Sequence, residues 1–173
     1  MEMISLPGSV NPENIERIKE KISKCLKNSS DEVTLFICSP GGVLSCAIHF
    51  YEWVRTEKIP LTTIAAGEVA SAALIVLLAG RKRKATSHSW FCIHKGGGLK
   101  WDYGSKLLRI LAPTRYKERV EWIKIMEQKA EEIILTETKI SPEKLHHALR
   151  TYYIFDAYEA EKLGFIEEVI TPA

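Results

Sequence analysis

The segment that most constrains the fold is GEVASAALIVLLAG, which runs from Gly67 to Gly80. Its core, Ala70 to Ala79, is almost entirely apolar, so a helix formed by it must be buried. The same core is far too short to cross a bilayer, so the helix belongs inside a globular domain. One hydroxyl, that of Ser71, lies where this helix begins. It either packs as a small residue among alanines or performs chemistry, because backbone N–H groups and the helix dipole favour a developing negative charge there.

Length and charge narrow the possible functions. At 173 residues the chain is expected to form one domain with a substantial core. Its 24 basic and 22 acidic residues nearly cancel, so the charge indicates no nucleic-acid partner. The only basic cluster, Arg81 to Lys84, is expected to be a solvated turn after the buried helix, with an anion or nucleic-acid patch as the alternative.

The sequence shows no targeting signal and no metal-binding spacing. The opening residues MEMISLPGSV contain neither the basic nor the apolar region of a secretory signal. The four cysteines, at positions 25, 38, 46 and 92, form no CxxC pair, so we expect small buried thiols in a reducing compartment. The sequence therefore predicts a cytoplasmic protein without a membrane segment, a metal ion or a cofactor.

Strand-like and helix-like segments alternate along the chain. Asn11 is expected to cap a helix that begins at Pro12, and Ser141 to cap one that begins at Pro142. A long amphipathic helix, from about residue 113 to 138, has more apolar positions than one narrow stripe, so we expect it to be buried against several neighbours. Strands are expected at residues 32–39, 61–66, 89–94 and 165–170, and further helices at 43–56, 67–80 and 156–164. This alternation indicates an α/β fold with much parallel pairing.

Three features could together form a catalytic site. Ser71 follows a strand and begins a helix. His94 ends a strand, at the edge of an α/β sheet where ligands usually bind. The sequence SPGG, residues 39–42, forms a turn after another strand, and its backbone N–H groups could receive an oxyanion. The serine does not lie in a G-x-S-x-G elbow, which disfavours an α/β-hydrolase.

These segments resemble the ClpP family, the proteolytic subunits of Clp proteases. The similar stretches are LPGSV, ICSPGGVLSCAIHFYEWV, TIAAGEVASAALIVLLAG, CIH and SPEKL…FDAYEAEKLGFIEEV, which together cover nearly the whole chain. The resemblance implies a single domain over residues 1–173 with the ClpP/crotonase-like α/β fold of repeated β-β-α units. It also implies a protruding long handle helix, within a handle region at about residues 96–138, that interdigitates between two stacked rings.

The activity implied by the resemblance is that of a serine endopeptidase, cleaving peptides or unfolded polypeptides inside paired homo-oligomeric rings. Ser71 matches the family's nucleophile, and His94 matches the general base that takes its proton. The N–H groups of Gly42 and Ala72 match the oxyanion hole. The implied substrate cleft, where an extended substrate would pair as an added strand, includes Gly41, Gly96, Gly97 and Gly98.

The third member of the family's triad is an aspartate, and the corresponding position here is Tyr152. A tyrosine can accept a hydrogen bond from the histidine but carries no charge at pH 7, so it would stabilise the imidazolium far less. Asp156 is an alternative acid, although Asp156 and Glu159 have the D-x-x-E spacing of a helix-capping box. Weaker candidates for the acid are Glu68 and Asp102. Lys95 adjoins His94 and could form a Ser-Lys arrangement instead, but neighbours on a strand point to opposite faces.

Two other functions stay open at this point. Because the triad aspartate is missing, the chain could be a catalytically impaired ClpP-like subunit with a structural or regulatory role. It could also be a crotonase-type acyl-CoA enzyme of the same fold, in which the glycine turn would serve a thioester enolate. The sequence begins almost at the first core strand, without the segment that forms the axial pore loops in the family. Partnership with an AAA+ unfoldase is therefore a weaker expectation than the peptidase site.

Overall fold

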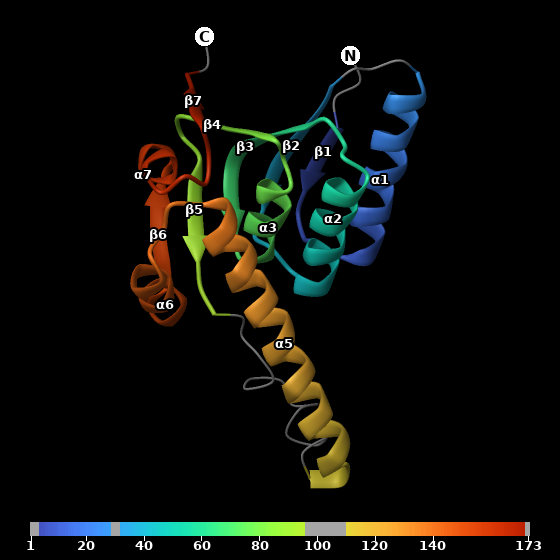
Figure 1. Cartoon of the computed structure of the whole chain (residues 1–173), viewed down its shortest axis with the longest axis vertical. Helices are drawn as coiled ribbons and strands as arrows, with labels where there is room; N and C mark the ends of the chain where they lie inside the picture. The colour runs from blue at the N-terminus through green and yellow to red at the C-terminus, as the bar shows by residue number, and fades with distance from the viewer. Residues whose placement is uncertain (1–3, 29–31, 96–109, 172–173) are drawn as a thin grey trace.

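A mostly parallel sheet forms the centre of the computed structural model, which describes residues 4–28, 32–95 and 110–171 (Figure 1). Five strands follow the order β1-β2-β3-β4-β7, each parallel to its neighbours. They are β1 (Ile4–Pro7), β2 (Val33–Ser39), β3 (Leu61–Ala70), β4 (Lys82–Thr86) and β7 (Glu168–Ile170). The first half of β3 pairs with β4, and its carboxyl-terminal end pairs with β5 (Trp90–Ile93). Strand β5 in turn runs antiparallel to β6 (Tyr153–Asp156). The predicted α/β fold with parallel pairing is confirmed.

The helices start where local capping signals place them. Asn11 accepts a hydrogen bond from the Asn14 N–H (2.8 Å), and Ser141 accepts one from the Lys144 N–H (3.2 Å), so both predicted caps are confirmed. The described helices are α1 (Pro12–Lys27), α2 (Leu44–Thr56), α3 (Ala72–Leu78), α5 (Pro113–Glu137), α6 (Pro142–Thr151) and α7 (Ala157–Lys162). Among the described residues, no helix combines the length and the apolar character needed to cross a bilayer.

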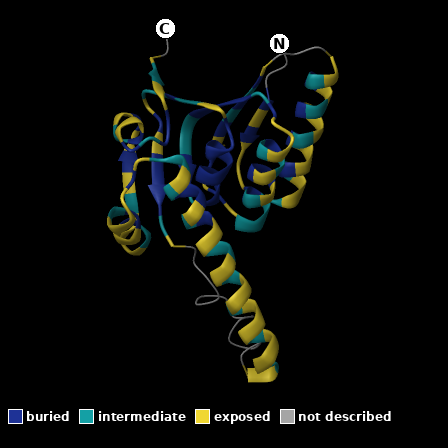
Figure 2. Cartoon of the chain, in the orientation of Figure 1, coloured by how far each residue is buried: buried dark blue, intermediate teal, exposed yellow. Residues whose placement is uncertain are grey.

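The short helix α3 lies at the heart of the core. Every residue from Ala72 to Leu78 is at most 2% exposed, as the apolar sequence predicted. The helix packs against β2 and β3 on one side and against α2 and α5 on the other (Figures 1 and 2). Because α3 is enclosed on all sides, the residue that precedes it has a fixed position relative to the sheet.

Strand β3 is longer than predicted and changes partners midway, from β4 to β5. Buried Ser89 holds the bend: its hydroxyl donates to the Ala65 carbonyl (2.9 Å) and accepts from the Gly67 N–H (3.1 Å). Beyond the bend, β3 ends at Ala70 beside β5, so Ser71 follows at the sheet edge where β5 also ends.

The basic cluster is part of a strand, so the predicted solvated turn is wrong for Lys82, Arg83 and Lys84. Three consecutive basic residues are accommodated in β4 because each forms an ion pair with an acidic residue far away in the sequence. Lys82 pairs with Glu32 (3.0 Å) and Lys84 with Glu168 (2.6 Å), both close to solvent.

Helix α5 extends well beyond the body of the molecule, and its projecting part is largely exposed (Figure 2). Its buried residues are Ala130, Ile133 and Ile134, near its carboxyl end. Burial against several neighbours, expected for the whole helix, therefore holds within one chain only for this end.

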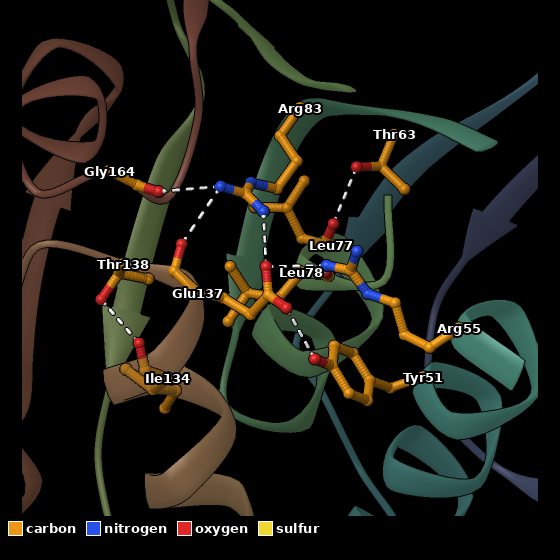
Figure 3. A network of polar contacts seen from close by, with 10 residues as sticks. All are labelled: Tyr51, Arg55, Thr63, Leu77, Leu78, Arg83, Ile134, Glu137, Thr138 and Gly164. Carbon is orange, nitrogen blue, oxygen red and sulfur yellow. Dashed lines mark hydrogen bonds and ion pairs between the residues drawn. The ribbon is translucent and has the colours of Figure 1, made fainter. Parts of the chain in front are cut away.

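The carboxyl end of α5 is tied to the body through one carboxylate, that of Glu137 (Figure 3). The Tyr51 hydroxyl donates to it (2.7 Å), and the guanidinium groups of Arg55 (2.7 Å) and Arg83 (3.1 Å) pair with it. Arg55 also donates to the carbonyl of Leu78, the last residue of α3 (3.1 Å). Glu137 therefore links α5 to α2, β4 and the end of α3.

Candidate active site

Ser71 has a backbone conformation that is rare for a residue with a side chain. Its φ of 55° and ψ of −125° place it at the sharp connection between β3 and α3. The Ser71 N–H donates to the Cys92 carbonyl (2.9 Å), so the connection is attached to β5. A non-glycine residue held in such a conformation stores strain, and strain of this kind concentrates at functional sites.

The predicted glycine turn packs directly against Ser71. Gly41 has a φ of 94°, and a Cβ added there would lie 2.6 Å from the Ala70 carbonyl oxygen and 2.8 Å from the Ser71 Cβ. Only glycine allows this approach of the two backbones. The sequence SPGG thus places the turn beside Ser71 and not simply at the surface.

Two backbone N–H groups are available beside Ser71. Val10 forms a parallel bridge with Gly42, in which the Val10 N–H donates to the Gly41 carbonyl and the Val43 N–H donates to the Val10 carbonyl, both at 2.8 Å. This pattern leaves the N–H of Gly42 directed away from Val10. Ala72 opens α3, so its N–H has no partner within the helix. These are the two N–H groups predicted for the oxyanion hole.

His94 follows the last residue of β5, as predicted. Its Nδ1 lies 3.0 Å from the Lys95 carbonyl oxygen, which can only accept, so the Nδ1–H donates to it and, in the neutral imidazole, Nε2 is the acceptor. The Lys95 N–H in turn donates to the Leu149 carbonyl (2.8 Å), which fixes this segment to α6. No hydrogen bond joins Ser71 to His94 in the part of the chain that the structure describes.

A cavity of about 100 Å³ brings these groups together. Gly42, Ser71, Ala72 and His94 all contribute to its lining. Residues of α5 and α6 close the opposite wall, in which Ala130, Ile134 and Leu149 form an apolar part. The structure thus places the predicted nucleophile, base and oxyanion-hole positions around one cavity.

Two glutamates of α5 also line this cavity, and each contacts a basic side chain from outside α5. Glu127 pairs with Lys95 and Glu131 with His146, in both cases at 3.5 Å. Lys95, considered for a Ser-Lys arrangement, is therefore engaged with a carboxylate of α5.

Tyr152 lies against His94, but not as a hydrogen-bond partner. The two rings are parallel, with 4.9 Å between their centroids and 5° between their planes. The Tyr152 hydroxyl makes no hydrogen bond within the described residues. The predicted contact between these residues is present, and its predicted geometry is wrong.

Asp156 occupies a capping position and not the catalytic one. It accepts a hydrogen bond from the Glu159 N–H (2.8 Å) at the start of α7 and pairs with Trp90, at the opposite end of β5 from His94. The reciprocal half of the capping box is not formed, because the Glu159 carboxylate binds Lys144 (2.8 Å). The other predicted members of the site, Gly96, Gly97, Gly98 and Asp102, lie outside the described residues.

Cys92 lies close to Ser71 without competing with it as a nucleophile. Burial, and then the charge of nearby Glu68, raise the pKa of the Cys92 thiol. At neutral pH the thiol stays protonated and therefore weakly nucleophilic. Among the described residues, no three His, Cys, Asp or Glu side chains are grouped so as to hold a metal ion.

Two residues that shape the site were not predicted from the sequence. Val10 holds the glycine turn through backbone hydrogen bonds, and Ser89 holds the bend that leads to Ser71. Nothing in the local sequence marks Val10. Ser89 could have been suspected as a polar residue at the start of a buried strand.

Comparisons with known proteins identify the family and the fold of the chain. The family model described as Clp protease matches residues 1–173. The fold is similar to that of a ClpP1 mutant from Listeria monocytogenes, with a TM-score of 0.82 and 21% identity over 98% of this chain and 91% of that one. It is also similar to the ClpP protease catalytic domain from Plasmodium falciparum, with a TM-score of 0.78 and 20% identity over 97% of this chain and 84% of that one. The chain has the ClpP fold and belongs to the Clp protease family.

Proposed function

We propose that the protein is a serine endopeptidase that cleaves peptides or unfolded polypeptides, with Ser71 as nucleophile and His94 as general base. One observation carries the proposal. A strained serine, a histidine whose Nδ1 contacts a backbone carbonyl, and two available N–H groups line one cavity, in a chain of the Clp protease family.

The arrangement suits acyl transfer. As the Ser71 Oγ attacks the carbonyl carbon of the scissile bond, His94 Nε2 takes the hydroxyl proton. The carbonyl oxygen becomes an oxyanion, which the N–H groups of Gly42 and Ala72 stabilise. His94 then passes the proton to the leaving amine, and water repeats the sequence on the acyl-enzyme to release the acid and restore the serine.

This mechanism requires a hydrogen bond between the Ser71 hydroxyl and His94 Nε2, which the unliganded site does not contain among the described residues. Catalytic hydrogen bonds are often absent from the unliganded site and form with bound substrate. The apolar part of the cavity wall, formed by Ala130, Ile134 and Leu149, supports a role for the cavity in receiving the substrate side chain next to the cleaved bond.

We also propose that the protein acts as paired rings of identical subunits. The support is the projecting part of α5, where Trp122 is 51% and Ile125 is 43% exposed. Apolar side chains exposed together in this way are suited to contact with another subunit. Light scattering should give a particle many times the 19.6 kDa mass of the chain, and a monomer would contradict this part of the proposal.

The peptidase proposal is tested with a fluorophosphonate probe, which bonds only to activated serines. The wild-type protein should gain one probe mass, and both Ser71→Ala and His94→Ala should abolish the gain. Intact-mass spectrometry reads the result directly. Labelling that survives in Ser71→Ala would assign the nucleophile elsewhere.

A second candidate is a catalytically impaired subunit with a structural or regulatory role. It is favoured by one observation: within the described residues, His94 has no hydrogen bond or ion pair with a carboxylate. This candidate predicts normal assembly without any labelling. Membership of the Clp protease family gives no support to an acyl-CoA enzyme.

A further inference from the structure

Tyr152 and His94 lie opposite each other at the end of the paired strands β5 and β6. The register of β5 and β6 pairs Ile93 with Tyr153, so His94 and Tyr152 are the next residues on the two strands and face each other. Such opposed residues are the natural partners for ring stacking in a sheet. The two rings are indeed stacked, with 4.9 Å between their centroids and an angle of 5° between their planes.

The conformation and exposure of Tyr152 are both unfavourable for stability. It ends α6 with a φ of 54° and a ψ of 73°, a left-handed conformation in which glycine or asparagine is normal and a bulky residue is an outlier. The residue is 66% exposed, and its hydroxyl has no hydrogen bond among the described residues. Packing therefore gives no reason for a tyrosine here. The contact with His94 does.

We infer that Tyr152 is a positioning residue for His94 that acts through the face of its ring. The inference rests on the proposed peptidase function. The stack restricts the imidazole plane while the Lys95 carbonyl keeps the proton on Nδ1. When His94 takes the proton of Ser71, the imidazolium lies over the electron-rich face of the phenol, an attraction absent for the neutral ring. This stabilisation arises as the charge forms, so it favours the transition state.

Three variants separate this role from a hydrogen-bonding or structural one. Tyr152→Phe keeps the ring and loses the hydroxyl. Tyr152→Asn suits the left-handed backbone and loses the ring. Tyr158→Asn removes another exposed tyrosine, on α7, and serves as the matched control.

The experiment combines probe labelling with NMR of protein carrying ¹³C-labelled histidine. The His94 signal, assigned from its loss in His94→Gln, should lie upfield in the wild type because its protons lie over an aromatic face. Tyr152→Asn should abolish this shift and slow labelling about tenfold, with no loss of thermal stability. Tyr152→Phe should keep the shift and label within about threefold of the wild type.

The outcomes are distinct. Labelling of Tyr152→Asn at the wild-type rate, or a His94 signal that Tyr152→Asn does not move, would overturn the role of the ring. Slow labelling of Tyr152→Phe would assign the effect to the hydroxyl and overturn it as well. A wild-type protein that is never labelled, with the upfield shift present, would overturn the peptidase proposal and this role with it.

Discussion

Replacing Glu137 by glutamine tests how α5 is attached to the rest of the domain. The substitution keeps the shape of the side chain and removes its charge. In the wild type one carboxylate accepts from the Tyr51 hydroxyl and pairs with the guanidinium groups of Arg55 and Arg83 (Figure 3). The variant leaves the two guanidinium groups close together without a counter-charge. Its amide oxygen can still accept from them and its N–H₂ can donate to the Tyr51 hydroxyl, so the lost charge is the main change.

The size of the effect follows from burial. Exposed ion pairs contribute about 0–1 kcal/mol, whereas removing one partner of a buried pair costs about 3–5 kcal/mol. The side chains of Glu137 and Arg83 are 17% and 12% exposed, close to the buried case, and that of Arg55 is 31% exposed. We therefore expect Glu137→Gln to lower the free energy of unfolding by about 3 kcal/mol.

Urea unfolding followed by tryptophan fluorescence, at one fixed protomer concentration, measures this difference. The control is Glu132→Gln on the same helix, where an exposed pair with Lys129 (3.0 Å) should be worth less than about 0.5 kcal/mol. A cost for Glu137→Gln no larger than that of the control would refute the assignment of Glu137 as the attachment point of α5.

Three further predictions concern Tyr51, Gly41 and Ala130. Burial, then the hydrogen bond and charge of Glu137, raise the pKa of Tyr51 to about 12. The unfolded chain ionises this group near pH 10, so stability falls as the pH rises from about 10 to about 12, and Tyr51→Phe should lessen that fall in unfolding titrations. Gly41→Ala should abolish probe labelling because its methyl group would lie 2.6 Å from the Ala70 carbonyl oxygen; Gly8→Ala, also at positive φ but in open space, should keep it. Ala130→Leu, which fills part of the cavity, should slow cleavage of peptides with bulky side chains while small probes still label Ser71.

The local elements of the fold could be predicted because their causes are local. Asn11 and Ser141 each accept from an N–H three residues ahead, so the sequence alone determines where those helices begin. Strand β4 could not be predicted, because its basic residues are stabilised by acidic residues far along the chain. Glu32 and Glu168 come from opposite ends of the sequence, and no local pattern connects them to Lys82 and Lys84.

Some features of the candidate site could likewise be predicted from the local sequence, and others depend on residues far apart in it. Ser71 and Gly42 could be identified because small residues and glycines must occur where backbones approach closely, and His94 because it follows a strand at the edge where ligands bind. Their roles came from the resemblance to the ClpP family. The stacking of Tyr152 could not, because it depends on the register between β5 and β6 and on a left-handed residue at the end of α6. The role of Asp156 was ambiguous in the sequence, since a capping carboxylate and a catalytic one look alike. Only its place at the far end of β5 from His94 separates the two.

The distribution of backbone strain bears on whether the site is active. Among the described residues, three that are not glycine have positive φ: Lys58, Ser71 and Tyr152. Lys58 lies just beyond the end of α2, where a left-handed residue is an ordinary way to end a helix. Tyr152 also ends a helix, α6, so the same explanation covers its backbone, whereas Ser71 follows a strand and has no such explanation. Ser71 and Tyr152 each cost on the order of 1 kcal/mol. They meet at His94 and its cavity. A subunit with only an architectural role gains nothing from holding Ser71 in this conformation, whereas a nucleophile requires a fixed position. The strain therefore favours the active peptidase over the impaired subunit.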